Sequence, residues 1–189
     1  MFQARLDLAA AIGKTAAAAL IAAFATTAAT DAQPPPLDPA PAIEAVQQLS
    51  FLVGNWSGDG WIQMGPGARE EFTQTETVEA KLDGAAILIE GIGHSKEATP
   101  RKVHHALALL SFDPSSKKLV FTSFVAGRPK LDAAAEASPG KLIWSFSPPN
   151  GGHIRYTAHI ADGEWHEVGE FSRDGQQWGQ FFEMHLKRN

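Results

Sequence analysis

From residue 54 onward, apolar and polar residues alternate along the chain in short runs. A period of two places successive side chains on opposite faces of a β-strand, and it is clear in KKLVFTSFV (117–125), KLIWSF (141–146) and HIRYTAHI (153–160). Turn signals separate these runs at short intervals, among them DPSSK (113–117) and PPNGG (148–152). The pattern therefore predicts an all-β chain, a single antiparallel up-and-down β-barrel of about 8–10 strands.

The stretch before the first strand has a different period. PAIEAVQQLSFLVG (41–54) predicts one short helix, with a proline suited to its first turn and Gly54 at its end. Its apolar residues recur at helical spacing: Ile43, Val46 and Leu49. Trp56 follows at once, and Gly58 and Gly60 share its face, which leaves room for a bulky neighbour. We expect the helix to cap one end of the barrel and Trp56 to seal it.

The first residues have the composition of a targeting segment. Arg5 and Lys14 precede an Ala-rich apolar run and a stretch of small residues, which predicts a signal peptide over 1–32. QPPPLDPAP (33–41) predicts an extended proline-rich linker, and residues 42–189 the barrel domain. The apolar run is short and mostly alanine, so no membrane span is expected. We expect a periplasmic or secreted protein.

The last two hairpins can be aligned residue by residue. Placing Asp162-Gly163 and Asp174-Gly175 in tight turns sets Arg155 opposite Glu170 and His159 opposite His166. A one-residue slip would bury these charged residues, so the alternate face is the core face. Residues on that face, together with Trp56, are the predicted ligand-binding set: Trp56, Tyr156, Trp165, Glu167, Trp178, Gln180, Phe182 and Met184.

Glu167 is the residue on this face that a plain core does not explain. A carboxylate in an apolar interior costs several kcal/mol unless it is paired or its pKa shifts. It is therefore either paired inside the barrel or directed at a ligand's polar group. Gln180 is expected near it.

Composition excludes several classes of function. The formal net charge is -5 with no basic block, so no nucleic-acid partner is expected. The absence of cysteine excludes disulfides and thiolate chemistry. The seven histidines show no metal-binding spacing, so neither a metal site nor a cofactor is expected, and no motif identifies a catalytic residue.

Two resemblances extend this interpretation. The short helix running into GNWSGDG (54–60) resembles the calycin superfamily of lipocalin-like barrels. SRDGQQW (172–178), FEMHLKR (182–188) and LLSFDPSSKKLVFTSF (109–124) resemble a bacterial family of uncharacterised, exported lipocalin-like proteins. FLVGNWSGDG (51–60) is also similar to nitrobindin-type haem barrels. That resemblance implies a proximal histidine near the last strand, where only His185 qualifies by position, although the alternation turns it outward.

Three functions are compatible with these observations. The first is an exported protein that binds a small apolar or amphiphilic molecule inside the barrel. The second is a lyase, isomerase or hydrolase with Glu167 as acid or base and Tyr156 or His105 as its partner. The third is a structural or interaction module of the cell envelope, with the proline-rich linker as spacer.

Overall fold

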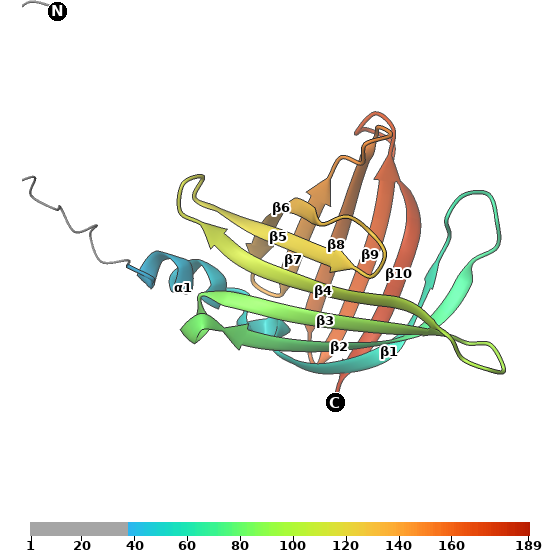
Figure 1. Ribbon diagram of the computed structural model, residues 1–189, viewed down its shortest axis with the longest axis horizontal. Coiled ribbons are helices and arrows are strands. Elements are labelled where there is room, and N and C mark those ends of the chain that lie inside the picture. Colours follow the sequence, from blue (N-terminus) through green and yellow to red (C-terminus); the bar gives the residue numbers. More distant parts are fainter. Residues whose placement is uncertain (1–37) are drawn as a thin grey trace, which may run out of the picture. The chain divides into compact units, whose positions relative to one another are not determined.

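A computed structural model describes residues 38–189 of the chain (Figure 1). The predicted signal peptide and most of the linker lie outside the described residues. The elements follow in chain order: α1 (Ala40–Gln47), η1 (Ser50–Leu52), β1 (Gly54–Ile62), β2 (Glu70–Lys81), η2 (Leu82–Gly84), β3 (Ala86–Ser95), β4 (Lys102–Asp113), β5 (Lys118–Val125), β6 (Leu131–Ser138), β7 (Lys141–Phe146), β8 (His153–Ala161), β9 (Glu164–Ser172) and β10 (Gly179–Arg188).

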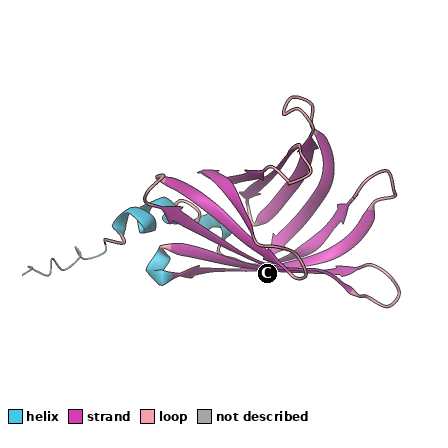
Figure 2. Ribbon diagram, turned by 45° about the horizontal axis from the view of Figure 1, so that its top comes forward, coloured by secondary structure: helices cyan, strands magenta, loops and turns pink. Residues whose placement is uncertain are grey.

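Ten antiparallel strands form one closed barrel, as the alternation predicted. Each strand pairs with its neighbours in sequence, and β1 pairs with β10 to close the sheet. Closure leaves no strand edge unpaired. Figure 2 shows the strands wrapping into the barrel, with the helical segments at one end. Within residues 38–189, no helix has both the length and the apolar character needed to span a membrane.

The predicted helix exists but is divided. α1 ends at Gln47, and a separate 3₁₀ turn, η1, covers residues 50–52 before the chain enters β1. The break lets both pieces direct apolar residues at the barrel, and Val46, Leu49 and Leu52 are all buried in its core. The helical segment therefore closes one end, as expected (Figure 1).

Trp56 organises this closed end. Its ring is fully buried, and Nε1 donates a hydrogen bond of 2.8 Å to the carbonyl of Leu52. The edge of Trp56 meets Trp165 with ring centroids 5.5 Å apart. Arg188, near the chain's end, stacks its guanidinium 4.1 Å above the Trp56 ring and donates to the carbonyls of Phe51 and Val53. The two ends of the barrel sheet are thereby joined at one tryptophan.

The β8–β9 hairpin has the predicted register. Arg155 lies opposite Glu170, and His159 lies opposite His166. The turn residues Asp162 and Gly163 both have positive φ, 53° and 77°, as an Asp-Gly turn of this kind requires.

The predicted register of the β9–β10 hairpin is wrong by one residue where the pairing begins and by two residues after a bulge. Gly179, and not Trp178, lies opposite Phe171, and the pairing shifts again at a bulge between Gln180 and Phe182. The connection is longer than a two-residue turn because the Asp174 carboxylate accepts hydrogen bonds from the backbone N–H groups of Gln176 and Gln177, at 2.8 and 3.0 Å. A local side-chain turn thus replaced the expected tight turn.

Replacing Trp56 tests the closed end. Trp56→Ala is expected to lower the free energy of unfolding by about 3–5 kcal/mol, since it removes a fully buried ring and leaves a cavity. Trp178→Ala is the matched control. It removes a half-buried ring held by Arg155, and about 1 kcal/mol should be lost. Urea unfolding of both variants measures the difference; equal losses would contradict the role given to Trp56.

Candidate functional site

The interior of the barrel is shaped by glycines that flank β2. Gln74 pairs with Gly58 on one side and Gly93 on the other, and Glu76 pairs with Gly91. A Cβ at Gly91 would lie 2.7 and 2.8 Å from the Glu76 carboxylate oxygens, and one at Gly93 would lie 2.6 Å from Gln74 Oε1. Only glycine leaves this space at these two positions, so β3 accommodates the polar side chains of β2.

A second carboxyl group enters from the opposite wall. Glu167, on β9, is buried beside Met184 of β10, and Trp165 Nε1 donates to its Oε2 at 3.1 Å. Glu76 is equally buried, and its Oε1 accepts a hydrogen bond of 2.7 Å from Gln74 Nε2. Among residues 38–189, no cationic side chain forms a salt bridge with either carboxyl group.

Each carboxyl group keeps one oxygen that the protein does not bond. Among residues 38–189, no group donates a hydrogen bond to Glu76 Oε2 or to Glu167 Oε1. The hydrogen bond that each carboxyl group accepts goes to its other oxygen, Oε1 of Glu76 and Oε2 of Glu167. Yet no fully enclosed side-chain nitrogen or oxygen in this part of the chain lacks a partner. Each of the two oxygens therefore keeps a small accessible area, although Glu76 and Glu167 are only 8% and 7% exposed.

Burial changes the acidity of this pair. It raises the pKa of Glu76 from 4.5 to about 7, against the lowering effect of Gln74. It raises the pKa of Glu167 from 4.5 to about 8, and negative charge on Glu76 contributes to that rise. The effect of Glu76 on Glu167 places the two carboxyl groups near enough to interact. Near neutral pH they favour a state that retains at least one proton.

An aromatic stack forms the neighbouring wall. Trp144 lies between Phe121 and Tyr156, nearly parallel to both, with ring centroids 4.4 and 3.9 Å apart. Phe182 meets the edge of Tyr156 at 5.6 Å. Trp144, Tyr156 and Phe182 are only partly buried although they face inward. Gly169 permits this arrangement, because a Cβ there would lie 2.7 Å from the Tyr156 ring.

Tyr156 connects the stack with the carboxyl pair. Burial raises the pKa of its phenol far above the ordinary value, and negative charge on Glu167 raises it further. Positive charge on Arg128, in the β5–β6 loop, acts in the opposite direction on Tyr156. Burial and the same Arg128 lower the pKa of His104. The phenol therefore stays neutral and remains a hydrogen-bond donor.

The structure divides the predicted binding residues into three groups. Tyr156, Glu167, Phe182 and Met184 surround the interior, as the alternation predicted. Trp56 and Trp165 also face inward but pack against each other at the closed end, so they belong to its floor. Trp178 and Gln180 are outside.

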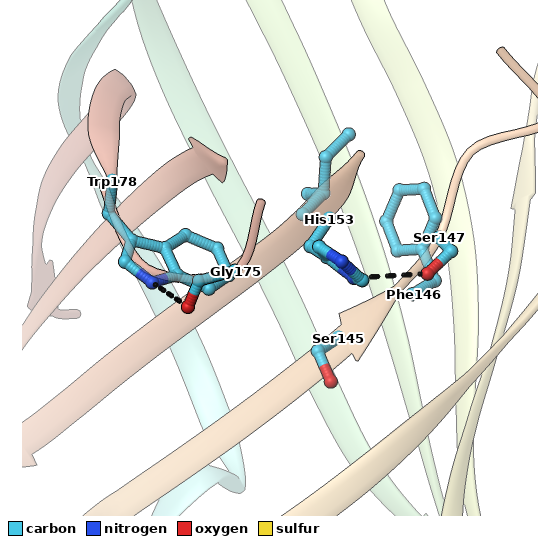
Figure 3. A pocket seen from close by; sticks show the side chains of 7 residues that line it. Ser145, Phe146, Ser147, His153, Gly175 and Trp178 are labelled. Atoms are coloured by element: carbon cyan, nitrogen blue, oxygen red, sulfur yellow. Dashed lines mark hydrogen bonds between the residues drawn. The ribbon is translucent and has the colours of Figure 1, made fainter. Parts of the chain in front are cut away.

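The exterior position of Trp178 and Gln180 corrects the sequence prediction. Gln180 pairs with Glu170, an outward residue, and is exposed. The Trp178 ring stacks with Arg155 at 4.0 Å and lines a shallow hollow of about 280 Å³ with Phe146, His153 and Gly175. Figure 3 shows this hollow, with Trp178 Nε1 donating to the carbonyl of Gly175. The one-residue register shift before the bulge turned both side chains outward, whereas the two-residue shift after it left Phe182 and Met184 inside.

Sequence reasoning missed Gln74 and Glu76. TQTETVEAK (73–81) reads as an exposed polar strand, yet Phe72 and Val78 have the same parity as these two residues and are buried. This alternation, with every second residue of the strand facing inward, was the signal that could have identified Gln74 and Glu76. His105, proposed as a partner of Glu167, instead lies on the outer face and contacts Glu90 at 3.0 Å.

Comparisons with known proteins support the fold alone. No family model matches the chain, and no curated protein matches it. A solved structure, "Crystal Structure of Rv2717c from M. tuberculosis", superposes with a TM-score of 0.57. The two chains are 13% identical, and the match covers 77% of this chain and 97% of the other. The protein therefore shares a barrel fold with that structure.

The raised pKa values predict a pH-dependent cost of folding. Above about pH 4.5 the unfolded chain releases the two protons, whereas the folded protein keeps them until about pH 7 and pH 8. The free energy of unfolding contributed by the pair therefore falls as pH rises from 4.5 to 8. Glu76→Gln/Glu167→Gln should match the natural protein at pH 4.5 and exceed its stability at pH 8.5 by several kcal/mol, at most about 8.

Urea unfolding across this pH range measures the difference. The control is Glu79→Gln/Glu164→Gln, which changes two exposed carboxyl groups on the same strands and should show no such divergence. A constant difference between the natural protein and the interior variant would contradict the raised pKa values.

Proposed function

We propose that the barrel binds a small amphiphilic molecule in its interior. The observation that carries this proposal is the pair Glu76 and Glu167, buried without a salt bridge to a cation and each with one oxygen that accepts no hydrogen bond from residues 38–189. An arrangement that lacks a partner within the protein is suited to receive one from a ligand.

The two walls suggest what the ligand contains. Carboxyl oxygens accept hydrogen bonds, so the polar group facing them carries donors, and a protonated amine satisfies them best. The partly buried rings of Tyr156 and Phe182 favour an apolar or planar portion, and aromatic faces also attract positive charge. An amphiphile with a donor-bearing head fits both surfaces.

We also propose that the protein acts outside the cytoplasm. Residues 1–32 support export, and the barrel with its end helix supports a lipocalin-like binding protein in the periplasm or outside the cell. A structural role in the envelope is less well supported, because the conspicuous polar groups lie inside the barrel.

Acid–base catalysis is the second candidate. Two interacting carboxyl groups with different pKa values, next to a neutral phenol, form a combination that enzymes use to move protons. A substrate with an acidic C–H or a leaving group at the head position would meet Glu167 and Tyr156 together. Turnover of a bound amphiphile, lost in Glu167→Gln with binding retained, would favour the enzyme over a binding protein.

A panel of amphiphiles with one tail tests the binding function. Dodecylamine, dodecanol and dodecanoate differ only in their head groups, and quenching of tryptophan fluorescence below their micelle concentrations reports binding. We expect the amine to bind about tenfold or more tightly than the carboxylate at pH 7, since charge-assisted bonds to carboxylates are the stronger ones.

Two variants separate the contribution of the carboxyl pair from that of the aromatic stack. Glu76→Gln/Glu167→Gln should abolish the preference for the amine while the alcohol still binds, and Trp144→Ala should weaken binding of all three. Phe124→Ala, an exposed ring on the outer face, is the control. No binding of any probe, or a head-group preference unchanged in the double variant, would overturn the proposal.

A further inference from the structure

Three potential metal ligands gather on the outer surface, across the sheet from Glu167. His166 of β9 lies directly opposite His185 of β10, and Glu183 precedes His185 by two residues on the same face. His166 Nε2 lies 2.9 Å from Glu183 Oε1, and His185 Nε2 lies 3.4 Å from the same oxygen. One potential ligand atom from each side chain lies within 4.8 Å of the other two.

These separations approach those of a metal centre. Ligand atoms bound tetrahedrally at about 2.0–2.1 Å from zinc are about 3.3 Å from one another. Both histidine–carboxylate distances are close to this value. The two imidazole rings stack with centroids 4.2 Å apart and planes 11° apart. An ion lies near the plane of each ring it binds, so both rings must turn about Cβ–Cγ, a torsion with broad energy wells.

The carboxylate is already oriented for this role. Trp61 Nε1, from β1, donates to Glu183 Oε2 at 3.0 Å, which holds the group and leaves Oε1 toward the histidines. Hydrogen bonds from neighbouring groups commonly orient metal ligands in this way. The site therefore draws on three adjacent strands of the closed sheet, β1, β9 and β10.

The surrounding charges permit a cation. Asp59 faces His185 from β1 and pairs with Lys96 at 3.0 Å, and His159 faces His166 from β8. The side chains of His166, Glu183 and His185 are 40%, 27% and 67% exposed, so an ion can reach them from solvent. Two imidazoles and one carboxylate suit borderline transition metals better than Ca²⁺ or Mg²⁺, which prefer oxygen ligands.

We propose that His166, Glu183 and His185 form a binding site for a divalent transition-metal ion such as Zn²⁺. Three protein ligands leave a fourth position for water. The ion would join β9 to β10 on the face opposite the carboxyl pair. This site is independent of the ligand proposed for the barrel interior.

Titration of the chelator-treated protein tests the site. Isothermal titration with Zn²⁺ should give one ion per chain, and Co²⁺ should give the intense visible absorption of a tetrahedral centre. His166→Gln, Glu183→Gln and His185→Gln should each lower the affinity at least about tenfold. His153→Gln, an exposed histidine of the outer face away from the cluster, should leave it unchanged.

Equal affinity in the natural protein and all three ligand variants would overturn the proposal, as would an equal loss in His153→Gln. Circular dichroism checks that each variant folds. If a variant does not, the histidine ring resonances of the natural protein decide. Zn²⁺ should shift those of His166 and His185 and leave that of His153 in place, whereas a shift confined to other histidines would reject the site.

Discussion

The burial of two carboxyl groups without a cation is the constraint on which this structure depends. An unpaired carboxylate in an apolar interior is costly, so the protein must protonate Glu76 and Glu167, solvate them or offer them a ligand. The rest of the barrel accommodates the pair. Glycines on β3 make room for the polar side chains of β2, and Trp165 and Gln74 each donate one hydrogen bond. A site that is expensive to fold is a reasonable place to look for function.

Packing at the closed end stabilises the fold and offsets the cost of burying the two carboxyl groups. Trp56 connects the helical segment, the first strand and the last strand through its hydrogen bond to Leu52 and its stacking with Arg188. Beyond that floor, the interior changes from tightly packed aliphatic residues to the carboxyl pair and the partly exposed aromatic stack. The barrel thus has one sealed, apolar end and an interior that also holds two carboxyl groups and partly buried aromatic rings.

Local patterns predicted the barrel, its end helix and the inward direction of Glu167, because period two and Asp-Gly turns act over a few residues. The register predicted for the last hairpin was wrong, because the alternation of apolar and polar residues does not reveal the hydrogen bonds of Asp174 or the bulge after Gln180. That error placed Trp178 and Gln180 inside and hid the pairing of His166 with His185. Glu76 was missed because pairing between β2 and β3 depends on glycines far along the chain.

The most direct test is to titrate Glu76 and Glu167 by NMR, with ¹³C-labelled side-chain carboxyl groups assigned through the two single Gln variants. We predict that Glu76 titrates at about pH 7 and Glu167 at about pH 8, and that removing Glu76 lowers the pKa of Glu167. Ordinary values near 4.5 for both groups, with no effect of Glu76 on Glu167, would contradict this prediction, because the carboxyl groups would then be solvated or paired and would not require a ligand.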